Sequence, residues 1–307
     1  MRILITGATG MLGYALTPVL ESNHRVIPLG SKDCDIRDLS AVRKTWFAHR
    51  PELVAHLAAY TDVDGCELNP RKAEECNVTG TRNVAQACAE AGALMLHVST
   101  DYVFDGRQDR QYQEMDQPNP INIYGQTKLL GERYIQLALN RYFIVRTSWL
   151  FGPRGKNFVA TIRSLARKGP ELRVVGDQRG CPTYTRHLAA KLAELVETEA
   201  YGIYHVTGAG DCSWYEFAES IVKLSGIDYV RLVSICSEEC GRPARRPANS
   251  ALQNQQLKRL GMGLLPHWKE ALAEYLGELM SEEELVNSEE RKHGRATPSE
   301  FIQCDIT

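Results

Sequence analysis

The 307-residue sequence lacks an excess of either charge, since 36 Lys and Arg residues stand against 38 Asp and Glu residues. Without a basic surplus, neither a nucleic-acid partner nor a polybasic membrane patch is expected. The sequence also lacks an apolar run of the length that spans a membrane, so it predicts no membrane partner. With 43% hydrophobic residues the chain can bury a large core, and we expect a globular protein with a small-molecule ligand.

A long apolar stretch is also missing near the N-terminus, where only Ile3, Leu4 and Ile5 precede Thr6 and Gly7. This run is too short for the hydrophobic region of a signal peptide and is typical of a buried strand. We therefore expect a cytoplasmic protein.

The nine cysteines include no Cys-x-x-Cys pair. Cys236 and Cys240 lie four residues apart, but no His or second Cys pair completes a zinc site around them. We predict no metal site, and we interpret the cysteines as reduced thiols, most of them buried.

The segment GATGMLG follows directly on the apolar stretch from Arg2 to Thr6, and a helical pattern of apolar residues comes after it. Strand, Gly-x-x-Gly-x-x-Gly and helix is the context of a dinucleotide-binding loop, because glycines let the backbone approach a pyrophosphate at the helix N-terminus. The residues that we expect to bind the cofactor here are Gly7, Gly10, Met11, Leu12 and Gly13.

A second predicted strand, Arg25 to Leu29, is not followed by the Asp or Glu that a fold selective for NAD places on the adenosine ribose. Ser31 and Lys32 stand there instead and suit a 2′-phosphate, which favours NADPH. Asp33 and Asp35 are near enough to keep NADH open.

A third predicted strand, Glu52 to Ala59, ends in small residues that leave room for a cofactor at the sheet edge. We therefore add Ala58, Ala59 and Tyr60 to the cofactor-binding set, together with Asp35 and Ile36 after the second strand.

The run from Leu68 to Ala91 is predicted to be one long helix with Asn77 on its inward stripe. A buried amide needs hydrogen-bond partners. Asn77 either bonds the strand that carries Ser99 or caps and packs within its own helix, and the residues alone leave both open.

Tyr124 and Lys128 are four residues apart in a predicted helix, which places both side chains on one face. A neighbouring ammonium lowers the pKa of a phenol, so the pair suits proton donation by Tyr124. Thr100 follows the predicted strand Leu94 to Val98, at the edge where open α/β sheets hold ligands, and can share a ligand oxygen with Tyr124. In a chain with 13 Tyr the spacing alone is near chance.

Strands alternate with helices in the first half of the chain, which predicts an α/β doubly wound parallel sheet, a Rossmann fold that binds NAD(P). We predict that this domain covers residues 1–151 and is rejoined by 183–207. A smaller α/β substrate-binding region would then comprise 152–182 and 208–280. Residues 281–307 are polar and poor in core residues, so we expect a disordered tail.

Seven segments, in this order and at these intervals, resemble the extended short-chain dehydrogenase/reductases and, more narrowly, the dTDP-4-dehydrorhamnose reductases: GATGMLG, STDYVFDG, YGQTK, RTSWLFG, GDQRGCPT, a Ser-Trp-Tyr segment and RRPANSAL. The resemblance covers the chain up to Met280. It implies hydride transfer from NADPH or NADH to the C4 ketone of dTDP-4-dehydro-L-rhamnose, a nucleotide sugar.

The resemblance also implies roles for single residues. Tyr124 would protonate the ketone oxygen, Lys128 would lower the pKa of Tyr124 and hold the nicotinamide ribose, and Thr100 would bond the same oxygen. The substrate-binding residues that it implies, besides Thr100, are Asp101, Trp149, Trp214 and Arg246. For Arg246 the chemistry agrees, because a guanidinium fork matches a diphosphate.

The sequence departs from the family in one respect that concerns a metal. Some members are described with magnesium at a dimer interface, held partly by an acid after the aromatic residue that follows the glycine loop. Here Tyr14 is followed by Ala15. We therefore expect no such magnesium, and a homodimer stays open.

Two alternative functions remain beside the reductase. A dehydratase or epimerase of the same superfamily usually carries an acid directly after the Thr-Asp pair, where this chain has Tyr102 and Val103. The regulatory β subunit of methionine adenosyltransferase resembles the same fold and binds the cofactor without established turnover. Trp149, Trp214 and the complete catalytic set favour the reductase.

Overall fold

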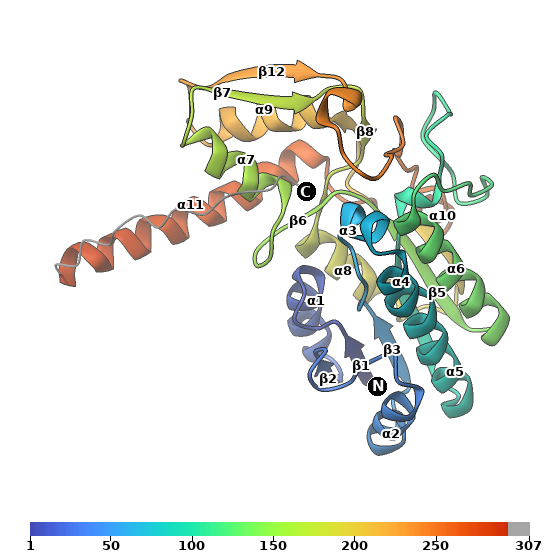
Figure 1. The fold of residues 1–307 in the computed structure, drawn as a ribbon. Helices are drawn as coiled ribbons and strands as arrows, with labels where there is room; N and C mark the ends of the chain where they lie inside the picture. Colours follow the sequence, from blue (N-terminus) through green and yellow to red (C-terminus); the bar gives the residue numbers. More distant parts are fainter. Residues whose placement is uncertain (294–307) are drawn as a thin grey trace.

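The computed structural model describes residues 1–293 and shows a large α/β part with a smaller α/β part beside it (Figure 1). Among these residues, no helix is both long enough and apolar enough to cross a lipid bilayer. The described cysteines are all free, and most are buried, whereas Cys236 and Cys240 are exposed.

The large part is built on a six-stranded parallel sheet in the order β10-β5-β4-β3-β1-β2. Its strands are β1 (Arg2–Thr6), β2 (Arg25–Leu29), β3 (Leu53–His56), β4 (Leu94–Thr100), β5 (Tyr142–Thr147) and β10 (Gly202–His205). Every pair is parallel. The chain returns from the edge strand β2 across β1 to β3, so a topological switch point lies between β1 and β3. The predicted doubly wound Rossmann fold is confirmed.

Helices cover both faces of this sheet (Figure 1). One face carries α1 (Met11–Glu21), α8 (Thr185–Leu195) and α10 (Gln255–Arg259), and the other carries α2 (Leu39–His49), α5 (Thr81–Ala91) and α6 (Ile123–Ala138). Along β1, Ile3 and Ile5 pack into the first core and Leu4 into the second, because successive strand residues point to opposite faces. Apolar residues on both faces bury β1 from Ile3 to Thr6, whereas Arg2 is exposed.

The helical stretch before α5 is more broken than the sequence predicts. It consists of α3 (Val63–Leu68), α4 (Pro70–Ala73) and a π-helical segment, Glu74–Gly80, that runs into α5. The single helix predicted from Leu68 is wrong, because the Asn69 side chain accepts a hydrogen bond from the backbone of Lys72 and starts a new helix at Pro70. The π-helical turn has no signature in the sequence.

The smaller part packs α7 (Phe158–Ala166), α9 (Trp214–Leu224) and α11 (Trp268–His293) around an aromatic core, beside the parallel pair β7 (Glu171–Val175) and β12 (Arg231–Ile235). Two short strand pairings lie beside it, an antiparallel one of β8 (Arg179–Gly180) with β11 (Cys212–Ser213) and a parallel one of β6 (Leu150–Phe151) with β9 (Thr183–Tyr184). Between them the chain re-enters the large part, where α8 packs on α1 and β10 pairs with β5. The exact domain limits stay a prediction.

The last helix, α11, continues to His293, whereas the sequence predicts a helix that ends at Met280 and a disordered tail. The carboxylate of Glu283 forms ion pairs of 3.1 Å with both Arg163 and Arg167 of α7. These ion pairs attach the polar continuation of α11 to α7, and the pattern of apolar residues in the sequence does not predict such a contact. The remaining residues of the predicted tail, 294–307, lie outside the described part of the chain.

Candidate active site

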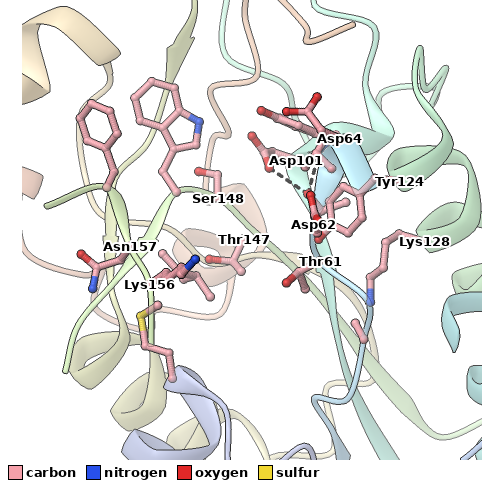
Figure 2. Close-up of a pocket in the computed structure, with 18 of the residues that line it drawn as sticks. Thr61, Asp62, Asp64, Asp101, Tyr124, Lys128, Thr147, Ser148, Lys156 and Asn157 are labelled. Atoms are coloured by element: carbon pink, nitrogen blue, oxygen red, sulfur yellow. Dashed lines mark hydrogen bonds between the residues drawn. The ribbon is translucent and has the colours of Figure 1, made fainter. Parts of the chain in front are cut away.

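A cavity of about 1270 Å³ opens at the carboxyl ends of the sheet strands and extends into the smaller part. Figure 2 shows Tyr124 and Lys128 on one wall and Ser148 and Lys156 on the opposite wall. Ligands of open α/β sheets bind at this edge, beside the switch point. The cavity is therefore the candidate active site.

The glycine loop forms the floor of one end of the cavity, and all five of its predicted cofactor residues line it. Gly7 has a φ of 71°, and a Cβ there would lie 2.6 Å from the backbone nitrogen of Ala58. A Cβ on Gly13 would lie 2.5 Å from the Gly7 carbonyl oxygen. Gly10 caps α1 without a side-chain hydrogen bond, so the helix N-terminus presents backbone N–H groups to an anion. This cradle fits a pyrophosphate.

The loop after β2 lines the next part of the cavity with Ser31, Asp35 and Ile36, as predicted, but not with Lys32. Arg37 lines it too and forms a bidentate pair with Asp35, with distances of 2.9 and 2.7 Å. The hydrogen bond from Arg37 lowers the pKa of Asp35. Because Arg37 offsets the Asp35 charge, this loop does not repel a 2′-phosphate. Arg37 is absent from the predicted cofactor-binding set, although its position two residues after Asp35 is a signal for such a pair.

The chain after β3 contributes Ala58 and Ala59 to the cavity, but Tyr60 does not line it. The Asn77 amide holds the backbone of Tyr60, since it accepts from the Tyr60 nitrogen at 2.8 Å and donates to the Tyr60 oxygen at 3.0 Å. Asn77 also donates to Thr127 of α6 at 3.2 Å. Its partners are therefore this loop and α6, not the strand that carries Ser99.

Tyr124 and Lys128 project from the first turns of α6, which the Asn122 side chain caps. A Cβ on Gly125 would lie 2.0 Å from the carbonyl oxygen of Tyr102, so only glycine lets this helix approach so closely. Burial raises the pKa of the Tyr124 phenol, and a hydrogen bond with Thr100 opposes the rise only in part. The structure thus brings Thr100, Tyr124 and Lys128 to one wall of the cavity.

The lowering of the Tyr124 pKa by Lys128 stays a prediction, since the described hydrogen bonds of Lys128 do not include the Tyr124 phenol. The Lys128 ammonium donates instead to the carbonyl oxygen of Val98 at 2.8 Å and contacts Nε2 of His97 at 3.2 Å. Burial lowers the pKa of Lys128 itself to about 8, against the charge of Glu132, which raises it. Only 2% of the Lys128 surface is exposed.

Asp101 follows Thr100 in a buried turn at the end of β4. The Thr100 hydroxyl donates to Asp101 at 3.0 Å and accepts from the backbone nitrogen of Tyr102 at 3.1 Å. Burial raises the pKa of Asp101 to about 7, against the hydrogen bond from Thr100. A carboxyl group with this pKa can donate a hydrogen bond to a ligand oxygen as well as accept one.

The two predicted tryptophans meet at the mouth of the smaller part. The rings of Trp149 and Trp214 are stacked with centroids 3.4 Å apart, and both residues line the cavity. Trp149 has a φ of 46°, in the left-handed region. Gly180 lies against the indole of Trp149, where a Cβ would be 2.3 Å from the ring.

Arg246 lines the cavity as predicted, but Asp64 of α3 already binds it, with contacts of 2.7 and 2.8 Å. Arg242 also donates to Asp64, at 2.9 Å. Burial opposes ionisation of Asp64, but the hydrogen bonds from Arg246 and Arg242 outweigh it and lower its pKa to about 2. Asp64 gave no signal in the sequence, because its partners lie far along the chain.

The region around Tyr14 does not fit the magnesium described for some family members. The guanidinium of Arg154 lies 4.4 Å from the centre of the Tyr14 ring, and a cation there disfavours a second one. Among residues 1–293 with described side chains, no group of three or more His, Cys, Asp or Glu could hold a metal ion.

The family model for the RmlD substrate binding domain matches residues 1–281. The dTDP-4-dehydrorhamnose reductase of Streptomyces griseus is 42% identical over 280 residues, which is 89% of this chain and 92% of that protein. A spore coat polysaccharide biosynthesis protein of Bacillus subtilis is also 42% identical, over 91% of this chain and 98% of the relative.

Solved structures agree with these relatives. The dTDP-4-dehydrorhamnose reductase of Bacillus anthracis, in complex with NADP, is 41% identical, with a TM-score of 0.88 over 90% of this chain and 99% of that one. The dTDP-4-dehydrorhamnose reductase of Clostridium acetobutylicum is 42% identical, with a TM-score of 0.89 over 91% of this chain and 100% of that one. The resemblance found in the sequence is confirmed: the chain belongs to the RmlD substrate binding domain family, the family of the dTDP-4-dehydrorhamnose reductases.

Proposed function

We propose that the chain reduces the C4 ketone of dTDP-4-dehydro-L-rhamnose to give dTDP-L-rhamnose, with NADPH as the preferred cofactor. The observation that carries this proposal is one cavity that joins a glycine loop to Thr100, Tyr124 and Lys128. Relatives at about 40% identity with this activity in their names support the choice of substrate.

The residues of the cavity fit NADPH. The glycine loop offers the pyrophosphate the open N-terminus of α1, and the positions of Gly7 and Gly13 leave no space for a Cβ. Ser31 and the Asp35–Arg37 pair would meet the 2′-phosphate, and Lys128 would bind the nicotinamide ribose. When bound, NADPH supplies the hydride for C4 of the sugar.

Tyr124 is the proton donor of the proposed reaction. Its raised pKa keeps the phenol protonated at neutral pH. As the C4–H bond forms, the phenol O–H bond breaks and its proton passes to the former carbonyl oxygen, which becomes the C4 hydroxyl. With substrate bound, the Thr100 hydroxyl would turn its single proton from Asp101 to the same oxygen and limit the charge that develops on it.

The substrate would extend from this wall into the smaller part of the protein. Asp101 and the Trp149–Trp214 pair would contact the sugar, and Arg246 would contact the diphosphate. The residue after the Thr-Asp pair is Tyr102, at the position where the dehydratases of this superfamily usually carry an acid. This favours reduction over dehydration. Cytoplasmic location and a homodimer remain predictions.

The proposal is tested by adding NADPH or NADH to the purified protein with dTDP-4-dehydro-L-rhamnose and following cofactor absorbance. We expect turnover with a preference for NADPH. Tyr124→Phe should lose about 10² to 10⁴-fold in kcat and keep its affinity for NADPH, since a positioned acid contributes this much. Binding of NADPH without turnover would contradict the proposed reductase activity and favour the function of a regulatory subunit.

A further inference from the structure

A buried histidine, His97, lies directly behind Lys128. It occupies β4, next to Val98, and only 1% of its surface is exposed. Its Nε2 atom lies 3.2 Å from the ammonium of Lys128, and its Nδ1 atom finds no hydrogen-bond partner among the described residues. The structure thus gives the ammonium two acceptors, the Val98 carbonyl and His97.

The surroundings keep the imidazole of His97 neutral. Burial and the charge of Lys128 lower its pKa well below the usual value. On its other side the ring of His56 from β3 is stacked at 5.2 Å, and burial lowers the pKa of His56 to about 3. His56 is held by its own partners, Thr6 at 2.7 Å and Thr81 at 3.2 Å. A neutral His97 with a proton on Nδ1 presents the lone pair of Nε2 to Lys128.

Other charged groups near Lys128 largely cancel. Glu132 of α6 is paired with Arg146 of β5 at 2.7 Å, and both are buried. Ser99 also donates to Glu132, at 2.5 Å. Tyr124, one turn before Lys128 on α6, remains a neutral phenol. The charged form of Lys128 therefore depends more on the uncharged acceptors that touch its ammonium than it would beside an unpaired carboxylate.

We propose that His97 is a positioning residue for catalysis: its Nε2 atom accepts a hydrogen bond from Lys128, fixes the ammonium on the cavity floor and stabilises its charged form. This rests on the proposed function, in which a charged Lys128 binds the nicotinamide ribose beside Tyr124.

The inference predicts a specific pH dependence. A hydrogen bond to the charged form of a lysine raises its pKa, and burial already holds the pKa of Lys128 down to about 8. Loss of the His97 acceptor lowers this pKa further. The decline of kcat/KM at high pH, where Lys128 loses its charge, then begins at a lower pH.

Three variants test this. His97→Leu removes the acceptor, and His97→Gln offers an amide oxygen in its place. His205→Gln is the control, because His205 is equally buried on β10 and contacts Tyr112 and not Lys128. For each variant we would measure kcat/KM from pH 6 to pH 9.5, and the pKa of Lys128 from the ¹³Cε shift of labelled lysine.

His97→Leu should move the basic limb down by about one pH unit, which lowers kcat/KM about tenfold at pH 8.5 and little at pH 6. The ¹³Cε titration should move with it, and His97→Gln and His205→Gln should keep the wild-type pH dependence. If His97→Leu lowered kcat/KM equally at every pH, and left both its decline at high pH and the pKa of Lys128 unchanged, His97 would have only a packing role. The titration needs no turnover, so an inactive wild-type protein would contradict the proposed function without deciding the role of His97.

Discussion

The indole rings of Trp149 and Trp214 lie face to face, with centroids 3.4 Å and planes 6° apart. Here the pair joins a residue just after β5 to the first residue of α9, and so links the large part of the protein to the smaller one. It also fixes the wall against which the sugar is proposed to lie.

Gly180→Ala should weaken substrate binding, because the new Cβ would lie 2.3 Å from the Trp149 ring and displace it from Trp214. We expect KM for the nucleotide sugar to rise about tenfold while the Kd of NADPH stays unchanged, which corresponds to about 1.4 kcal/mol. Gly169→Ala is the matched control, since no atom lies within 4 Å of its Cβ position. Equal KM values for the two variants would contradict a binding role for the stack.

Arg37→Met should reduce the preference for NADPH. The change removes a cation from the cavity and leaves Asp35 as an unpaired carboxylate that repels a 2′-phosphate. Because both side chains are about half exposed, we expect a modest effect, about a tenfold fall in the ratio of kcat/KM for NADPH to that for NADH. Arg43→Met, which breaks a surface pair with Glu90, should leave this ratio unchanged. A ratio unaffected by Arg37→Met would place the 2′-phosphate elsewhere.

Asp64 should make stability depend on pH in acid. Its folded-state pKa is lowered to about 2 from an ordinary value of 3.8, so it stabilises the fold above pH 3.8 and this contribution is lost as the pH falls toward 2. Asp64→Asn should lower the free energy of unfolding at pH 7 by about 1 to 2 kcal/mol, and the deficit should shrink in acid. Denaturant titrations at pH 7 and pH 2 measure this. Asp109→Asn, at an exposed carboxylate, is the control, and a deficit of the same size at pH 2 as at pH 7 would contradict the ion-pair explanation.

The parts of the site that depend on short spacings could be predicted from the sequence. The glycine loop follows its strand directly, and Tyr124 and Lys128 are one helical turn apart, so local geometry places these residues. Thr100 could be located because strand ends of a parallel sheet share one edge.

Contacts between distant segments could not be predicted. Asp64 binds Arg246 across 182 positions, and His97 meets Lys128 across 31, and no periodicity encodes either pairing. The same reason explains why the sequence left the partners of Asn77 open, since they lie on the loop after β3 and on α6. The extension of α11 depends on Glu283 reaching two arginines of another helix.

The most direct test of the proposed reduction is transfer of deuterium from NADPH labelled at the transferable C4 position. Incubation with dTDP-4-dehydro-L-rhamnose should give dTDP-L-rhamnose with one deuterium at C4 of the sugar, detected by mass spectrometry and NMR, and Tyr124→Phe should slow its appearance about 10² to 10⁴-fold. An epimerase or dehydratase returns the hydride to the sugar and consumes no external cofactor. A product without deuterium, or no consumption of NADPH by a protein that binds it, would contradict the proposed reduction.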